Sequence, residues 1–236
     1  MSTTATQRVP MDSLRKTALV AGLFYLVTFV SIPTLSLFAP LREANYVLGP
    51  GPDTAIIIGG ILELIVALAG IATAVTLYPV IKRQNEGMAL GFVGSRVLEA
   101  ATLFAGVVTV MSLVNLRQTG AGSQALAAGS ALVALRTWTT LLGQGFIPAV
   151  NAVLLGTLLY RSGLVPRILP VLGLIGAPLL TATALATMFG LWDQVSVPSA
   201  IATIPIALWE LSLGIWLVVK GFRPSPITAG MTASGL

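Results

Sequence analysis

The sequence contains no cysteine and no histidine. Without cysteine there are no disulfides and no thiolate nucleophiles, and without histidine there is no imidazole acid–base chemistry and no zinc or haem site of the usual kind. The acidic residues within the apolar segments are few and scattered, so neither a metal site nor a cofactor is predicted. The sequence also lacks a phosphate-binding loop and a nucleophile elbow, which disfavours an ATP-driven pump.

Charged residues are scarce as well. They make up only 9% of the 236 residues, against 56% hydrophobic residues and a mean hydropathy of +0.93, whereas a soluble domain carries roughly a quarter charged residues. The net charge of +5 comes from cations spread singly or in pairs, without the basic stripe that binding to nucleic acid requires. The predicted partner is therefore a lipid bilayer and no nucleic acid, and the predicted location is the plasma membrane.

The apolar segments are long enough to cross the hydrocarbon core of a bilayer, which takes about 20 residues of helix. They predict an all-α fold, an integral membrane bundle of about six transmembrane helices joined by linkers that contain proline, glycine and polar residues. The six predicted spans cover residues 17–39, 54–81, 88–115, 138–160, 168–190 and 200–220.

The chain is thus predicted to form a single transmembrane domain over residues 17–221, between a cytoplasmic tail at 1–16 and a disordered cytoplasmic tail at 222–236. Residues 117–137 leave an alternative open, because this partly apolar stretch either lies on the membrane surface or extends the fourth helix. If it crossed the membrane by itself, seven spans would place the two ends of the chain on opposite sides.

The distribution of Lys and Arg predicts the orientation. With the N-terminus in the cytoplasm, nine cations fall on the cytoplasmic side and three, Arg42, Arg117 and Arg136, fall on the outer side. This excess is what the positive-inside rule requires. The remaining cation, Arg96, lies within the third predicted span.

Ionisable residues inside the predicted spans are the first candidates for a functional site, because a charge near the bilayer centre costs at least ~2.5 kcal/mol on insertion scales. Two uncharged residues with strong hydrogen-bonding side chains lie at similar depth. The ligand-binding candidates are Glu63, Arg96, Glu99, Gln144, Asn151 and Glu210.

Arg96 and Glu99 are three residues apart, so they lie on one face of a helix and are expected to form an ion pair. Glu63 and Glu210 then have no second cation within the predicted spans. At least one of these two acids is expected to sit in a wet cavity, to hydrogen-bond to a polar side chain of the fourth span, or to be protonated. The alternative is a purely structural contact, in which a protonated Glu binds a carbonyl of a neighbouring helix.

Prolines inside the predicted spans add polar backbone to the bundle, because each proline lacks an N–H group and frees a carbonyl one turn earlier. Kinks next to polar side chains suit a ligand cavity, although kinks are also ordinary in membrane helices. The prolines concerned are Pro33, Pro148, Pro178 and Pro205.

Two stretches resemble a bacterial membrane family known as domain of unknown function 4386. They are LYPVIKRQNEGMALGFVGSRVLEAA, from Leu77 to Ala101, and YRSGLVPRILPVLGLIGAPLL, from Tyr160 to Leu180. The sequence departs from the family pattern at Glu63, where an arginine is expected, and at Pro170, where a glycine is expected. The resemblance implies a small multi-pass membrane protein and no catalytic residue, since the family has no assigned activity. Its most recognisable positions here are Leu77-Tyr78, Arg96, Glu99, Arg161-Ser162-Gly163 and Pro166-Arg167.

Three functions are compatible with this pattern. The leading hypothesis is a transporter- or sensor-like protein whose central polar residues bind a small molecule, an ion or a proton. The alternative from another class is an intramembrane enzyme with a buried Glu as general acid for a lipid-like or isoprenoid substrate, which a cavity open to lipid with an acid at its end would favour. The third is a structural or accessory subunit in which polar groups only hold helices together. The pattern predicts no particular oligomeric state.

Overall fold

The computed structural model describes residues 12–43, 46–49, 53–120, 122–229 and 231. Within them, six helical segments are long and apolar enough to cross a membrane, which confirms the prediction of an all-α bundle with six spans. The helices are α1 (Ser13–Val27), α2 (Thr34–Leu37), α3 (Thr54–Ile81), α4 (Glu86–Gln118), α5 (Gln124–Thr140), α6 (Ile147–Ser162), α7 (Ile168–Met188) and α8 (Val197–Val219).

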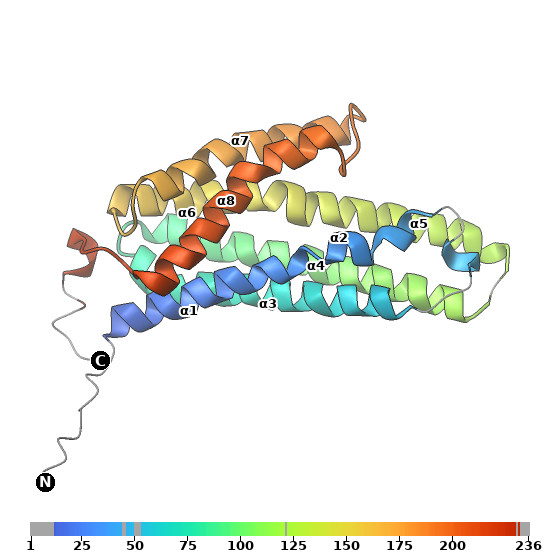
Figure 1. The fold of residues 1–236 in the computed structure, drawn as a ribbon, viewed down its shortest axis with the longest axis horizontal. Helices are drawn as coiled ribbons and strands as arrows, with labels where there is room; N and C mark the ends of the chain where they lie inside the picture. Colours follow the sequence, from blue (N-terminus) through green and yellow to red (C-terminus); the bar gives the residue numbers. More distant parts are fainter. Residues whose placement is uncertain (1–11, 44–45, 50–52, 121, 230, 232–236) are drawn as a thin grey trace, which may run out of the picture.

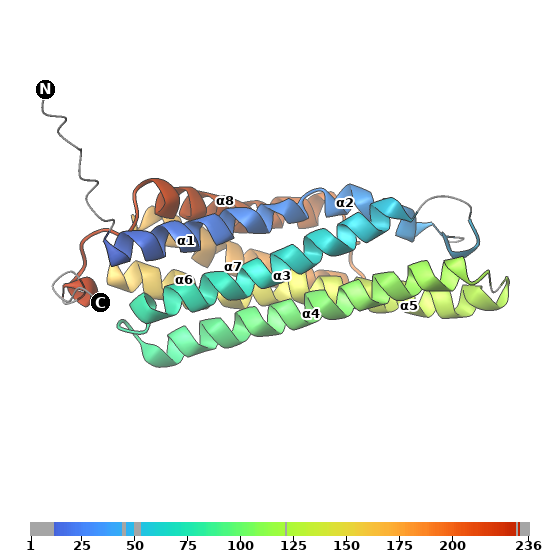
Figure 2. The ribbon, with the colours of Figure 1, turned by 90° about the horizontal axis from the view of Figure 1, so that it is seen from below.

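The spans form a closed ring of neighbours. Helix α1 packs on α3, α3 on α4, α4 on α6, α6 on α7 and α7 on α8, and α8 returns to α1, while α5 lies along α4 (Figures 1 and 2). Large side chains such as Tyr25, Phe92 and Trp209 are fully buried inside this ring. Close approach of the helices depends on small residues: a Cβ atom at Gly173 would lie 2.5 Å from the Trp209 ring.

Pro33 interrupts the first span. Because this residue lacks an N–H group, the α-helical ladder stops before it. Helix α1 ends at Val27, a 3₁₀ turn covers Thr28–Ser31, and α2 begins at Thr34. The Ile32 N–H donates to the Phe29 carbonyl at 3.1 Å, a 3₁₀ bond that satisfies a carbonyl the proline leaves free. The α-helix of the first span is therefore interrupted next to the proline inside it.

The fourth span is longer than predicted. Helices α5 and α6 are continuous through a π-helical turn at Leu141–Phe146, so a single helical segment runs from Gln124 to Ser162. Pro148 explains the turn, because its nitrogen carries no hydrogen and cannot donate to the Gln144 carbonyl one turn earlier. The backbone widens there into the π-helical turn. Of the two alternatives for residues 117–137, the structure shows an extension of the fourth helix from residue 124 onward, while residues 117 and 118 are the end of α4.

Both ends of the described chain meet at one end of the bundle, where α1 begins and α8 ends (Figure 1). Residues 222–229, which belong to the predicted C-terminal tail, contact the end of the bundle. The Ser225 hydroxyl donates to the Ser162 carbonyl at 2.6 Å, and the Arg223 N–H donates to the Leu164 carbonyl at 2.7 Å. The tail residues 232–236 and the predicted N-terminal tail up to residue 11 lie outside the described residues.

Candidate functional site: two buried charge clusters

Arg96 is the centre of a buried cluster in which one cation serves two acids. Its Nη1 atom lies 2.9 Å from Glu99 Oε2, as the spacing on α4 predicts, and its Nη2 atom lies 3.2 Å from Glu210 Oε1 of α8. The side chain of Arg96 is only 4% exposed, and those of Glu99 and Glu210 are 13% and 18% exposed. When all three groups are ionised, this Arg96 cluster carries one excess negative charge.

The two carboxylates are not equivalent. Glu99 Oε2 accepts a second hydrogen bond from Asn151 Nδ2 of α6 at 2.7 Å, whereas Glu210 receives the longer bond from Arg96 Nη2. That same Nη2 also donates to the Tyr25 hydroxyl of α1 at 3.3 Å. Glu99 thus accepts two hydrogen bonds and Glu210 one, so Glu210 is the weaker partner of Arg96.

Two atoms of the Arg96 cluster remain without a hydrogen-bond partner in the described protein. They are the donor Arg96 Nε and the acceptor Asn151 Oδ1, both fully buried. Both side chains bind Glu99 Oε2, so they are close to each other. An unpartnered buried polar atom costs roughly 1–3 kcal/mol, so each of these two atoms would gain from a hydrogen-bond partner.

A second cluster surrounds Glu63 in α3. Arg136 of α5 donates to both Glu63 carboxylate oxygens, and Gln144 of the π-helical turn donates to Oε1 at 3.2 Å. Glu63 is fully buried. Gly106 makes room for this contact, since a Cβ atom there would collide with Arg136 Nη1. One cation and one acid make this Glu63 cluster neutral.

The six predicted site residues therefore divide between two clusters. Arg96, Glu99, Asn151 and Glu210 form one, and Glu63 with Gln144 belongs to the other. The expected Arg96–Glu99 pair is confirmed, and of the alternatives left open for Glu63 and Glu210 the structure shows a hydrogen bond from Gln144 to Glu63. The prediction that there is no second cation is wrong for Glu63, which binds Arg136, whereas Glu210 shares Arg96 with Glu99.

Two members of these clusters are not predicted by the sequence. The sequence pattern places Arg136 in an outer loop, although this residue lies inside the helix that runs from Gln124 to Ser162. The unmatched Glu63 is the signal that could have found it, because a buried acid requires a partner. Apart from its amphipathic side chain, nothing in the sequence indicates that Tyr25 belongs to the Arg96 cluster. With Arg136 inside the bundle, the predicted charge asymmetry becomes nine cations against two, Arg42 and Arg117.

A third polar contact lies outside the spans, near the end of α4. Asp53 accepts from the Tyr46 hydroxyl at 3.0 Å and lies 3.1 Å from Arg117 Nη1. Burial and the hydrogen bond to Asp53 raise the pKa of Tyr46, and the nearby Arg117 opposes this shift. This contact ties the loop before α3 to the far end of α4.

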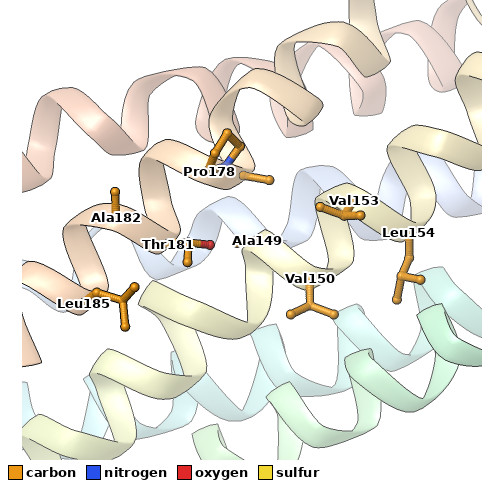
Figure 3. Close-up of a pocket in the computed structure, with 9 residues that line it drawn as sticks. Ala149, Val150, Val153, Leu154, Pro178, Thr181, Ala182 and Leu185 are labelled. Atoms are coloured by element: carbon orange, nitrogen blue, oxygen red, sulfur yellow. The ribbon is translucent and has the colours of Figure 1, made fainter.

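An apolar groove of about 510 Å³ lies between α6 and α7 (Figure 3). Val150 and Val153 line it from α6, and Pro178 and Leu185 line it from α7. Thr181 supplies its polar atom (Figure 3), and no acidic residue of the described chain lines it. The groove therefore lacks the acid that an intramembrane enzyme of the predicted kind requires. Among the described residues there is also no group of three or more potential metal ligands.

The family model described as "Domain of unknown function (DUF4386)" matches residues 20–221 of this chain, which include both charge clusters. No curated protein and no solved structure matches the chain.

Proposed function

This chain belongs to the DUF4386 family, whose description assigns no activity, and we propose from its geometry that it is a transporter- or sensor-like protein that binds a proton at the Arg96 cluster. The observation that carries the proposal is the sharing of Arg96 by two carboxylates on different helices. A net charge inside a bilayer is costly, and one proton removes the excess negative charge.

Glu210 is the acid that takes the proton in this proposal. Glu99 accepts two short hydrogen bonds, from Arg96 and Asn151, while Glu210 accepts one longer bond and is the acid held less firmly. A protonated Glu210 no longer forms an ion pair with Arg96. Helix α8 packs on α1 and α7, and this ion pair is its charged link to α4. Proton binding would therefore loosen α8 from α4, which is the kind of two-state element that a carrier or a sensor needs.

The unpartnered Arg96 Nε and Asn151 Oδ1 favour a small hydroxyl-bearing molecule as a second guest of the same site. We place the protein in the plasma membrane, with both described ends on the cytoplasmic side, on the basis of its charge distribution. The Glu63 cluster fits the structural interpretation instead, because its acid and its cation neutralise each other.

Infrared difference spectroscopy of the full-length protein in lipid, recorded between neutral and acidic pH, tests the proposal. We expect a protonated carboxyl band to appear in the wild type as the pH falls. The band should be absent from both Glu210→Gln and Glu99→Gln, because either change leaves one acid for one cation. Glu86→Gln, an exposed acid at the start of α4, is the matched control and should retain the band. A band that persists in both cluster variants would contradict the proposal.

A further inference from the structure

We propose that the groove between the start of α1 and the residues after α8 binds the headgroup of an anionic phospholipid. The groove has a volume of about 600 Å³ and is separate from both charge clusters. Its walls are the first turn of α1 and residues 220–229 after α8. The proposal does not depend on proton binding at the Arg96 cluster.

The groove is built by specific contacts. Arg15 of α1 donates from Nη1 to the Leu217 carbonyl at 2.8 Å and from Nη2 to the Val218 carbonyl, so it joins the start of α1 to the end of α8. Gly221, at φ +75°, then turns the chain back across α1, and its Cα carries no side chain that would crowd Arg15. The groove is thus a fixed feature of the packed helix ends.

Charge favours an anionic occupant. Arg15, Lys220 and Arg223 line the groove, against the single acid Asp12. Lys220 and Arg223 are exposed, so their charges are available to a ligand. The Arg223 guanidinium lies 5.2 Å from the centre of the Trp216 ring, which holds the charge beside an aromatic residue at the end of a span.

The apolar part of the lining favours a phospholipid over a soluble anion. Leu14 and Phe222 contribute side chains to the same groove as the cations. A phospholipid has a charged phosphate next to the apolar first carbons of its acyl chains. This arrangement matches the cations and the apolar side chains of the groove. The groove also lies where the spans end, at the level of lipid headgroups, and basic pockets at such positions bind anionic lipids in membrane proteins.

Native mass spectrometry of the full-length protein tests this inference. The protein is incubated with phosphatidylglycerol or with zwitterionic phosphatidylcholine, and the retained lipid is counted. We expect preferential retention of phosphatidylglycerol by the wild type. In the double variant Lys220→Gln/Arg223→Gln, the affinity for phosphatidylglycerol should fall about thirtyfold, because each cation near an anionic headgroup contributes a factor of about five to this affinity.

The matched control is Lys82→Gln/Arg83→Gln, which removes the same charge from exposed residues of the α3–α4 turn at the same end of the bundle. It should retain phosphatidylglycerol as the wild type does. Equal losses in the two double variants would overturn the inference, because they would indicate general attraction to surface charge. Equal retention of the two lipids, or displacement of phosphatidylglycerol by soluble glycerol phosphate, would overturn it as well.

Discussion

At the scale of single residues, the two buried clusters differ in the ratio of acid to cation. Glu63 and Arg136 form a pair in which each charge depends on the other, whereas the Arg96 cluster has one acid more than it can neutralise. Loss of one partner of a buried ion pair leaves an uncompensated charge and costs about 3–5 kcal/mol. Loss of a surplus acid carries no such penalty.

The same substitution should therefore destabilise the protein much more at Glu63 than at Glu210. We expect Glu63→Gln to lower the free energy of unfolding by about 3 kcal/mol, because Arg136 loses its counter-charge. Glu210→Gln should change it by less than about 1 kcal/mol, because Arg96 keeps Glu99. Thermal unfolding of both variants in the same detergent measures the difference. Equal destabilisation would show that both acids are needed as counter-ions.

Gly106 gives a second prediction at this scale. A Cβ atom there collides with the Arg136 guanidinium, so Gly106→Ala should displace Arg136 and destabilise the protein by about 1–3 kcal/mol. Gly94 lies on the same helix, and a Cβ atom added to it would have nothing within 4 Å. Gly94→Ala is thus the control, and it should be neutral or stabilising by up to about 1 kcal/mol. A harmless Gly106→Ala would mean that the Arg136 contact does not need this space.

Tyr46 gives a prediction on pH. Its pKa is raised, so the folded protein keeps the phenolic proton to a higher pH than the unfolded chain, which releases it near pH ~10. The stabilisation from the Tyr46–Asp53 bond is then fully present below pH ~10 and is lost as the pH rises through the folded-state pKa. The stability difference between wild type and Tyr46→Phe, measured by thermal unfolding, should shrink above that pH. A difference that stays constant would contradict the assignment.

At the scale of elements, the sequence predicted the other spans better than it predicted the fourth one. Helix α3 begins and ends where hydropathy places it, and α7 differs by two residues at its end. The segment of α5 could not be assigned because a helix that carries Arg136 resembles a loop in a hydropathy profile. Its partner Glu63 lies 73 residues earlier in the sequence, and only the packed structure brings the two together.

The candidate site shows the same limit. Neighbours on one helix, such as Arg96 and Glu99, follow from the helical repeat. The contact of Arg96 with Glu210 spans 114 residues and depends on how α8 packs beside α1. The composition of the spans indicates which charged residues need a partner. The packing of the helices determines which partner each of them has.

The joint between α1 and α8 gives a prediction at this scale. Arg15 donates to two carbonyls at the end of α8, a contact that needs the planar fork of a guanidinium. We expect Arg15→Lys to lower the free energy of unfolding by about 1.5 kcal/mol while keeping the charge. Lys16→Gln, an exposed neighbour on the same helix, should leave it within about 0.5 kcal/mol. Similar unfolding temperatures for the two variants would contradict the proposed joint.

At the scale of the whole molecule, the bundle is longer than a bilayer is thick. Helix α4 has 33 residues and at 1.5 Å per residue is about 50 Å long, while the hydrocarbon core measures about 30 Å. At the right-hand end of the bundle in Figure 1, the hairpin of α4 and α5 extends past the ends of the other spans.

The absence of native cysteine makes the orientation directly testable. Gln84 in the α3–α4 turn and Ser123 before α5 lie at opposite ends of α4. A membrane-impermeant thiol reagent should label Ser123→Cys in intact cells and Gln84→Cys only after permeabilisation. Labelling of Gln84→Cys from outside would reverse the predicted orientation.

The central claim is that a proton on Glu210 weakens the charged link between α8 and α4. Hydrogen–deuterium exchange of α8 in the lipid-reconstituted protein, corrected for the intrinsic pH dependence of amide exchange, tests it most directly. Protection of α8 should fall as the wild type is acidified, and in Glu210→Gln it should be low at every pH. Protection of α8 that depends neither on pH nor on Glu210 would contradict the account and leave the Arg96 cluster as a structural contact.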